Sequence, residues 1–251
     1  MMRAYDALAG VYDSLNGEVD YSAIADFAVS LFDRYHIRPE LVLDLGCGTG
    51  ALTLEMAKHG YDMIGIDASN AMLSLAYERK MREGRPDVLF LQQDMRSFEL
   101  YGTVGAVVSS LDCFNYLTGE GDLVRCLSLV HNYLEPNGII VFDVNSPYKF
   151  ERVFGNEAYI LENESAYCGW QNQYDRETKC CTFYLSVFEE DEDGRYIRRD
   201  EEQVERCYDE GELRDALVRT GFSDICFFGD LKGNPPTENS ERWYVAARCK
   251  K

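Results

Sequence analysis

The sequence predicts an α/β protein whose main sheet is mostly parallel. Over the first 146 residues, short apolar runs alternate with amphipathic stretches, which indicates strands buried on both faces with helices between them. After residue 146, apolar and polar residues alternate one by one, a pattern typical of antiparallel strands. Two apolar runs near the C-terminus then add strands to the main sheet. With 251 residues, the chain is long enough to bury a core of this size.

Residues 1–146 carry the pattern of the main sheet. Asp20 and Ser69 are placed to cap two helices, and Asp122 opens a third. Pro136, followed by Asn-Gly, is expected to end that third helix. The expected strands are 41–45, 62–66, 88–92, 104–110 and 138–144, and the expected helices include 51–59 and about 69–83.

Residues 147–208 are predicted to form an antiparallel insertion, and residues 209–251 a helix and two strands that complete the main sheet. Asp193-Gly194 predicts a hairpin turn inside the insertion. Asp209 and Glu212 have the spacing of a capping box for the last helix. The expected strands of the insertion are 159–167, 169–174, 180–189 and 195–207, and those of the C-terminal part are 222–229 and 243–249.

The most informative segment is LVLDLGCGTG, residues 41–50. Gly46, Cys47 and Gly48 form a turn with almost no side-chain bulk after a buried strand, and glycines let the backbone approach a ligand closely. Asp67 ends the next apolar run, where a carboxylate is placed to accept hydrogen bonds from both hydroxyls of a ribose. This geometry suits an adenosine-containing cofactor.

Three interpretations of this segment differ in the ligand. Gly46, Gly48 and Ala51 satisfy the loose dinucleotide pattern G-x-G-x-x-G/A. Asp44 argues against a dinucleotide, because a carboxylate two residues before the first glycine would repel a pyrophosphate and attract a cation. S-adenosylmethionine carries an ammonium, a sulfonium and a ribose, and it ranks above a dinucleotide. A turn without a ligand ranks last, because it leaves the buried charge of Asp44 unexplained.

Three motifs resemble those of the class I S-adenosylmethionine-dependent methyltransferases, whose Rossmann-like sheet has an antiparallel last strand. LDLGCGTG resembles their first motif, IGIDASNAML (64–73) their second, and QQDMRSF (92–98) the acidic segment after their third strand. The resemblance covers residues 1–145 well and the rest in outline. It implies S-adenosylmethionine as cofactor and S-adenosylhomocysteine as product.

The same resemblance assigns roles on the adenosine side. It implies that Asp67 binds the ribose with Ala68 beside it, and that Met72 lies near the adenine. Asp94 and Met95 are then expected at the adenine edge.

The ends of the predicted strands support this assignment independently. Gly46, Asp67, Asp94 and Ser110 all lie at the carboxyl ends of their strands, where ligands collect in parallel sheets. We therefore expect Ser110 at the cofactor site as well.

The loop after strand 104–110 is expected to lie under the transferred methyl group. Asp112 and Asn115 are candidates to orient an amine, and Tyr116 to wall the pocket. Equally open is that Asn115 and Tyr116 simply start the next helix. Trp170, with other aromatic residues of the insertion, either walls the acceptor pocket or contributes to an interface with a second subunit in a homodimer.

The histidines bear on the acceptor atom. Methylation of a hydroxyl needs a general base, whereas an amine needs only alignment and loss of its proton. The chain has three histidines, His36, His59 and His131, all within or at the ends of predicted helices and none at the carboxyl end of a strand. This favours a nitrogen acceptor or an already acidic oxygen, and no catalytic residue is assigned.

Small-molecule enzymes give the nearest resemblance within the superfamily. DMRSFELYGTVGAVVSSLDCFNYL is similar to its counterpart in sugar N,N-dimethyltransferases and glycine-type N-methyltransferases. Tyr12, in its Tyr-Asp pair, resembles the N-terminal segment of such relatives, which implies a lid over the cofactor. For Tyr5 we expect packing against the core.

Composition limits the partners and the compartment. Asp plus Glu number 44 against 25 Lys plus Arg, a net charge of −19 that weighs against a nucleic-acid substrate. No apolar run is long enough to span a bilayer, and the N-terminus does not resemble a signal peptide. The nine cysteines show no C-x-x-C spacing, so we predict no metal site and a reducing, cytoplasmic location.

Two other functions compete with a small-molecule methyltransferase. A nicotinamide-dependent oxidoreductase conflicts with Asp44 and lacks a second nucleotide-binding half. A non-catalytic S-adenosylmethionine-binding regulatory protein with a decayed acceptor site stays open, because intact donor motifs do not exclude it.

Overall fold

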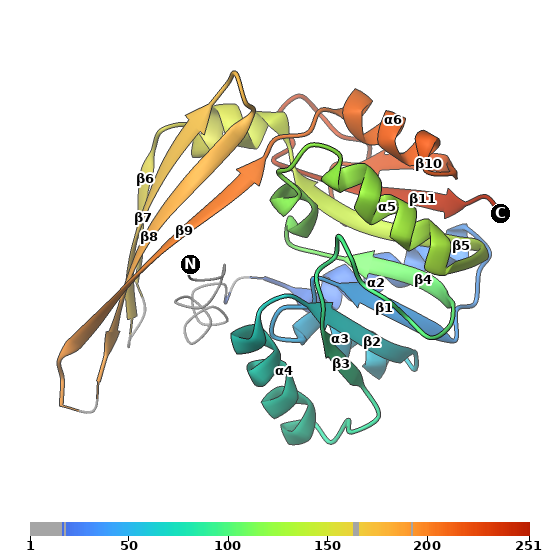
Figure 1. Cartoon of the computed structure of the whole chain (residues 1–251), viewed down its shortest axis with the longest axis horizontal. Helices are drawn as coiled ribbons and strands as arrows, with labels where there is room; N and C mark the ends of the chain where they lie inside the picture. Colours follow the sequence, from blue (N-terminus) through green and yellow to red (C-terminus); the bar gives the residue numbers. More distant parts are fainter. Residues whose placement is uncertain (1–16, 18, 163–165, 192) are drawn as a thin grey trace.

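The computed structural model describes residues 17, 19–162, 166–191 and 193–251. These residues form a seven-stranded sheet with helices on both faces and a four-stranded sheet that projects from one side of this core (Figure 1). The predicted class, an α/β fold with a mostly parallel sheet and a separate antiparallel sheet, is confirmed. Tyr5 and Tyr12 lie outside the described residues.

The main sheet has the strand order β10-β11-β5-β4-β1-β2-β3. Strands β1 to β5 are parallel, β11 is antiparallel to β5, and β10 is antiparallel to β11. The antiparallel last strand expected from the resemblance is therefore present. The strands are β1 (Leu41–Leu45), β2 (Asp62–Asp67), β3 (Leu89–Gln92), β4 (Val104–Ser109), β5 (Leu134–Asn145), β10 (Phe222–Phe228) and β11 (Arg242–Cys249).

The start of β5 differs from the expectation. The strand begins at Leu134, directly after helix α5 (Asp122–Tyr133), so Pro136 lies inside it. Leu134 pairs with Val104 of β4, and the register then shifts before Ala106 pairs with Ile139. A proline is tolerated at such an irregularity, because its missing N–H removes no regular ladder bond.

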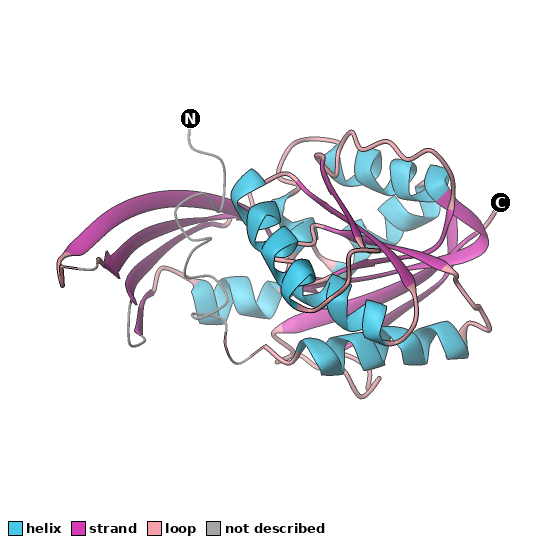
Figure 2. Cartoon of the chain, turned by 90° about the horizontal axis from the view of Figure 1, so that it is seen from below, coloured by secondary structure: helices cyan, strands magenta, loops and turns pink. Residues whose placement is uncertain are grey.

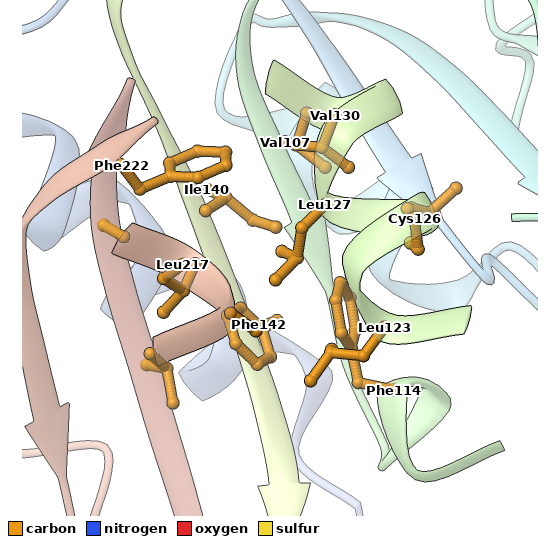
Figure 3. Close-up of a cluster of buried hydrophobic side chains, with 14 of the residues drawn as sticks. Val107, Phe114, Leu123, Cys126, Leu127, Val130, Ile140, Phe142, Leu217 and Phe222 are labelled. Carbon is orange, nitrogen blue, oxygen red and sulfur yellow. The ribbon is translucent and has the colours of Figure 1, made fainter. Parts of the chain in front are cut away.

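Helices cover both faces of the main sheet (Figure 2). One face packs against α2 (Tyr21–Arg34), α3 (Ala51–Lys58) and α4 (Asn70–Arg82), and the other against α5 and α6 (Glu210–Arg219). In Figure 3, Leu127 of α5 and Leu217 of α6 point toward Ile140 and Phe142 of β5. Burial of such side chains is the main favourable contribution to folding.

The predicted helix caps are present. The Asp20 carboxylate accepts from the backbone N–H of Ala23 at 2.9 Å, and the Ser69 side chain accepts from that of Met72 at 3.3 Å. Asp209 begins α6 with the predicted capping box. Each cap satisfies backbone N–H groups that a helix leaves unpaired at its start.

The four-stranded sheet is antiparallel, in the order β6-β7-β8-β9. Its strands are β6 (Ala158–Glu162), β7 (Ala166–Asp175), β8 (Cys180–Glu190) and β9 (Tyr196–Arg206). The expected single strand over 159–167 is wrong: β6 ends at Glu162, and Tyr167 belongs to β7, where it pairs back with Glu162. Alternation of apolar and polar residues continues on both sides of a reversal, so it does not show where the chain turns back.

Two short helical turns lie where this sheet meets the core: the π-helical turn η2 (Lys149–Phe154) joins β5 to β6, and the 3₁₀ turn η1 (Cys113–Tyr116), between β4 and α5, contacts β9. A helical start at Asn115 and Tyr116 was one of the two open expectations for η1, whereas η2 was not predicted. Phe150 and Phe154 of η2 pack with Phe183 of β8 in one buried cluster. The projecting sheet is therefore anchored on the side where the parallel strands end.

Candidate functional site

A cavity of about 900 Å³ opens across the carboxyl ends of β1, β2, β3 and β4. This is the edge at which the sequence places Gly46, Asp67, Asp94 and Ser110, and all four line the cavity. The other predicted residues on its wall are Cys47, Gly48, Ala68, Met72, Met95 and Tyr116. The structure thus brings most of the expected cofactor residues together.

The glycine-rich turn after β1 requires glycine on steric grounds. Gly46 has a φ of +81°, and an added Cβ would lie 2.6 Å from the Cys113 sulfur. Gly50 has a φ of +74°, and an added Cβ would lie 2.7 Å from the Phe90 ring. At Gly48, also with a positive φ, an added Cβ would meet nothing within 4 Å. At Gly46 and Gly50 the turn is therefore tightly packed against the protein, whereas at Gly48 it is open toward the cavity.

Asp67 joins the turn to the end of β2. Its Oδ2 accepts from the backbone N–H of Gly48 at 2.8 Å, and its Oδ1 accepts from that of Ser69 at 2.8 Å. Burial raises the pKa of Asp67, and the two backbone hydrogen bonds oppose that rise. Each carboxylate oxygen keeps a further lone pair. Asp67 can therefore accept from two ligand hydroxyls as well.

Asp44 lies behind the turn rather than on the cavity wall. Its side chain is 1% exposed, and its Oδ2 accepts from the Thr53 hydroxyl at 2.6 Å. Burial raises the pKa of Asp44 to about 7. An ammonium contact of the kind expected from the sequence would therefore act across the turn or through water.

The adenosine side contains a cation that sequence reasoning missed. Arg96 lines the cavity and forms a two-point ion pair with Asp94, with Nε 2.8 Å from Oδ1 and Nη2 2.5 Å from Oδ2. The hydrogen bonds from Arg96 hold the pKa of Asp94 below its usual range. The Asp-x-Arg spacing in QQDMRSF was a signal for this pair. Tyr21, at the start of α2, also lines the cavity; its Asp20-Tyr21 pair resembles the N-terminal segment of small-molecule relatives, but it was given no site role.

The loop after β4 borders the cavity near Ser110. Leu111 and Asp112 both adopt left-handed backbone angles, with φ values of 58° and 57°. Asp143, at the end of β5, holds them, because its carboxylate accepts from the N–H of Leu111 at 2.9 Å and of Asp112 at 2.6 Å. Two adjacent residues in this strained region persist only when their surroundings fix them.

Asp112 lies in an ion-pair network behind the cavity wall. Its Oδ1 is 2.6 Å from Nη2 of Arg242, whose Nη1 also pairs with Asp143. Burial raises the pKa of Asp143, and the Arg242 charge opposes this. Cys113, which belongs to the loop expected near the methyl group but was given no role of its own, lines the cavity, and its sulfur is 3.3 Å from the Gly46 carbonyl oxygen.

Three acceptor candidates remain, and only one of them lies on the cavity wall. Tyr116 lines the cavity. Asn115 is fully buried: its Nδ2 donates to the carbonyl of Arg206, and its Oδ1 accepts from the N–H of Asn145, both at 2.9 Å. Both polar atoms of the Asn115 amide group therefore form hydrogen bonds with backbone groups. Trp170 packs within the projecting sheet against aromatic neighbours and is not on the cavity wall. Tyr12 lies outside the described residues.

Metal ligands do not gather anywhere in the described part of the chain: no group of three or more His, Cys, Asp or Glu side chains there could hold an ion. Nor does any described helix have the length and apolarity to cross a membrane.

The fold and the cavity together define an α/β enzyme that holds an adenosine-containing cofactor at the ends of its parallel strands. Comparison with known proteins identifies the cofactor. A family model described as a methyltransferase domain matches residues 42–138. The chain is 32% identical over 249 residues to the putative methyltransferase YqeM of Bacillus subtilis, covering 98% of both chains. It belongs to that family, among the class I S-adenosylmethionine-dependent methyltransferases.

Two further comparisons extend this result. A crystal structure of an S-adenosylmethionine-dependent methyltransferase from Clostridium acetobutylicum superposes with a TM-score of 0.89 at 26% identity, covering 99% of this chain and 100% of that one. A dTDP-3-amino-3,4,6-trideoxy-α-D-glucopyranose N,N-dimethyltransferase from Streptomyces venezuelae is 31% identical over 150 residues, or 59% of this chain and 60% of the relative. The oxidoreductase interpretation is thereby excluded.

The residues present fit S-adenosylmethionine. The open side of Gly48 leaves room for a ligand against the backbone, and Asp67 has lone pairs to spare for a ribose. Met72 and Met95 supply apolar wall for an adenine. Acidic side chains around the glycine-rich turn are complementary to the positively charged ammonium and sulfonium groups in the methionine part of S-adenosylmethionine.

Proposed function

We propose that this enzyme methylates a nitrogen atom of a small-molecule amine. The observation that carries the proposal is the position of the histidines. His36 is exposed, His59 pairs with Asp26, and His131 packs against Phe222. None of the three histidines lines the cavity. A hydroxyl acceptor would lack the imidazole base that it commonly needs.

The names of relatives agree with this acceptor. The Streptomyces venezuelae relative is an N,N-dimethyltransferase of an amino sugar nucleotide, and glycine/sarcosine N-methyltransferases are also similar, one at 27% identity over 162 residues. The net charge of −19 favours a small amine over a polyanionic nucleic acid. All nine cysteines are free, which supports a reducing compartment such as the cytoplasm.

When bound, S-adenosylmethionine supplies a methyl group on a positively charged sulfur, which keeps the bonding electron pair when the methyl leaves. The chain contributes position and exclusion of water. Asp67 and the Gly46–Gly50 turn hold the donor, and Ser110, Leu111 and Tyr116 form the wall on the acceptor side.

The test uses S-adenosylmethionine with a labelled methyl group and pairs of compounds that differ only in amine or hydroxyl. Glucosamine is compared with glucose, and glycine with glycolate. We expect label transfer to the amines only. Transfer to the hydroxyl compounds in place of the amines would contradict the proposal.

A further inference from the structure

Strand β9 carries a row of buried polar side chains on one face. Glu201, Gln203 and Glu205 are 6%, 6% and 3% exposed, whereas Glu202 between them is exposed. Alternate residues of a strand share a face, and buried faces are normally apolar. The burial of two carboxyl groups and one amide on this face therefore needs a structural or functional explanation.

The row borders the wall of the cofactor cavity. Tyr116 lines the cavity, and its hydroxyl donates to Oε1 of Gln203 at 2.7 Å. Nε2 of Gln203 donates to Oε1 of Glu201 at 2.5 Å. Glu205 is two residues further along the same face, about 7 Å from Gln203 at the rise of a strand. Glu205 also faces Asp112, whose neighbours Leu111 and Cys113 line the cavity, so the polar row lies directly behind the cavity wall.

Glu205 is a buried carboxyl group without a cation of its own. Burial, the charge of Asp112 and a hydrogen bond to the Asp112 side chain raise the pKa of Glu205 well above its usual range. Arg242 is near enough to oppose the rise, but its guanidinium is paired with Asp112 and Asp143. Lys149 is the other facing cation, and burial lowers its pKa. Within the described residues, Glu205 forms no ion pair.

Asn145 adds a second unmet requirement at the same place. Its Nδ2 donates to Oε2 of Glu205 at 2.9 Å, so its amide lies against that carboxyl group. Asn145 is 1% exposed, and its Oδ1 has no hydrogen-bond partner. A buried acceptor without a donor is destabilising. The pair therefore combines a carboxyl group that forms no ion pair with an amide oxygen that has no donor.

We propose that Glu205 and Asn145 bind the ammonium group of the acceptor amine, which enters beside Tyr116 when the Gln203 side chain turns aside. An ammonium meets both requirements at once, because it carries a positive charge and several N–H donors. The inference rests on the proposed nitrogen acceptor and names the residues that recognise it.

A proton transfer follows from this contact. A protonated amine has no lone pair for the methyl group, so one proton must leave its nitrogen first. The proton passes from the ammonium nitrogen to a Glu205 carboxylate oxygen, and the N–H bonding electrons stay on nitrogen as the lone pair. Asp112, Arg242 and Lys149 are the charged groups that face Glu205 at this step, and Asp143 pairs with Arg242 beside them.

The decisive comparison is Glu205→Gln against Glu202→Gln, which makes the same change on the exposed face of the same strand. Methyl transfer to glucosamine and glycine, affinity for S-adenosylhomocysteine by calorimetry, and melting temperature are measured for both. For Glu205→Gln we expect kcat/KM to fall at least tenfold, S-adenosylhomocysteine affinity to stay within twofold, and the melting temperature not to fall. For Glu202→Gln we expect all three within twofold or unchanged.

Other outcomes separate this inference from the proposed function. Equal kinetics of Glu205→Gln and wild type on a methylated amine would overturn the inference alone, as would a lower melting temperature with weaker S-adenosylhomocysteine binding, which is the mark of a structural role. Methylation of glucose or glycolate would overturn the nitrogen acceptor instead. If no probe is methylated, the amines are titrated calorimetrically into the S-adenosylhomocysteine complex, and absence of saturable binding to the wild type overturns the inference.

Discussion

The Asp67 carboxylate accepts a hydrogen bond from the backbone N–H of Gly48, 2.8 Å away and nineteen residues earlier in the chain. This contact joins the glycine-rich turn to the end of β2 and fixes two parts of the cofactor cavity relative to each other. The residue that is expected to hold the ribose therefore also shapes the turn.

Replacement of Asp67 should therefore weaken cofactor binding in two ways, by removing the expected ribose contact and by freeing the glycine-rich turn. For Asp67→Ala we expect affinity for S-adenosylhomocysteine to fall by roughly ten- to a hundredfold, because hydrogen bonds to a charged group contribute about 1.5–3 kcal/mol. Calorimetry measures the change. Asp62→Ala, at the exposed start of the same strand, is the control and should bind normally. Unchanged affinity in Asp67→Ala would contradict the assignment.

Steric packing under the turn should make Gly50 intolerant of any side chain. Gly50→Ala places a Cβ 2.7 Å from the Phe90 ring at a φ of +74°. We expect the free energy of unfolding to fall by about 2–4 kcal/mol, from backbone strain plus overpacking. Gly60→Ala, at a φ of +93° with nothing within 4 Å, should lose only the strain part, about 1–2 kcal/mol. Urea unfolding measures both; equal losses would refute the packing argument.

The buried Asp44 should make stability depend on pH. Its pKa is raised from 3.8 to about 7 in the folded protein, so the folded state binds the proton more tightly than the unfolded state. The resulting stabilisation is complete below pH 4 and is lost as pH rises to about 7. Asp44→Asn should therefore flatten the pH dependence of unfolding over this window.

Unfolding by urea at pH 4, 5, 6 and 7 tests this, with exposed Asp62→Asn as the control. The control should keep the wild-type slope. A wild-type slope in Asp44→Asn would show that other groups titrate in this window.

The ion pair between Arg242 and Asp143 should be far more sensitive to mutation than a surface pair. Arg242→Met leaves the buried Asp143 carboxylate without its cation, and we expect a loss of about 3–5 kcal/mol in the free energy of unfolding. Arg38→Met removes a pair whose side chains are 79% and 63% exposed, and we expect a loss of at most about 1 kcal/mol. Comparable losses in the two variants would contradict the structural role of Arg242.

The adenosine side of the site could be predicted from sequence because it depends on short segments. The turn after β1 and Asp67 after β2 each follow a buried strand directly, so knowing the strands is enough to place them at one edge. The same reasoning put Ser110 on the wall. Met72 and Met95 are on the wall too, where the resemblance placed them.

The acceptor side could not be predicted, because it depends on residues far apart in sequence. Asp112 and Arg242 are separated by 130 positions and meet only because β11 lies beside β5. Asn115 looked like a ligand contact, but its amide bonds the backbones of Arg206 and Asn145. A local pattern contains neither the strand order nor the register that creates such pairs.

Strand β9 and the turn η1 share a set of contacts that has a thermodynamic consequence. Asn115 donates to the Arg206 carbonyl, Tyr116 to Gln203, and the Tyr208 hydroxyl to the Leu117 carbonyl, so the cavity wall and the projecting sheet form one mechanical unit. A ligand that orders β9 also orders the wall of the donor cavity. By reciprocity, any change that acceptor binding causes in donor affinity is matched by an equal change that donor binding causes in acceptor affinity.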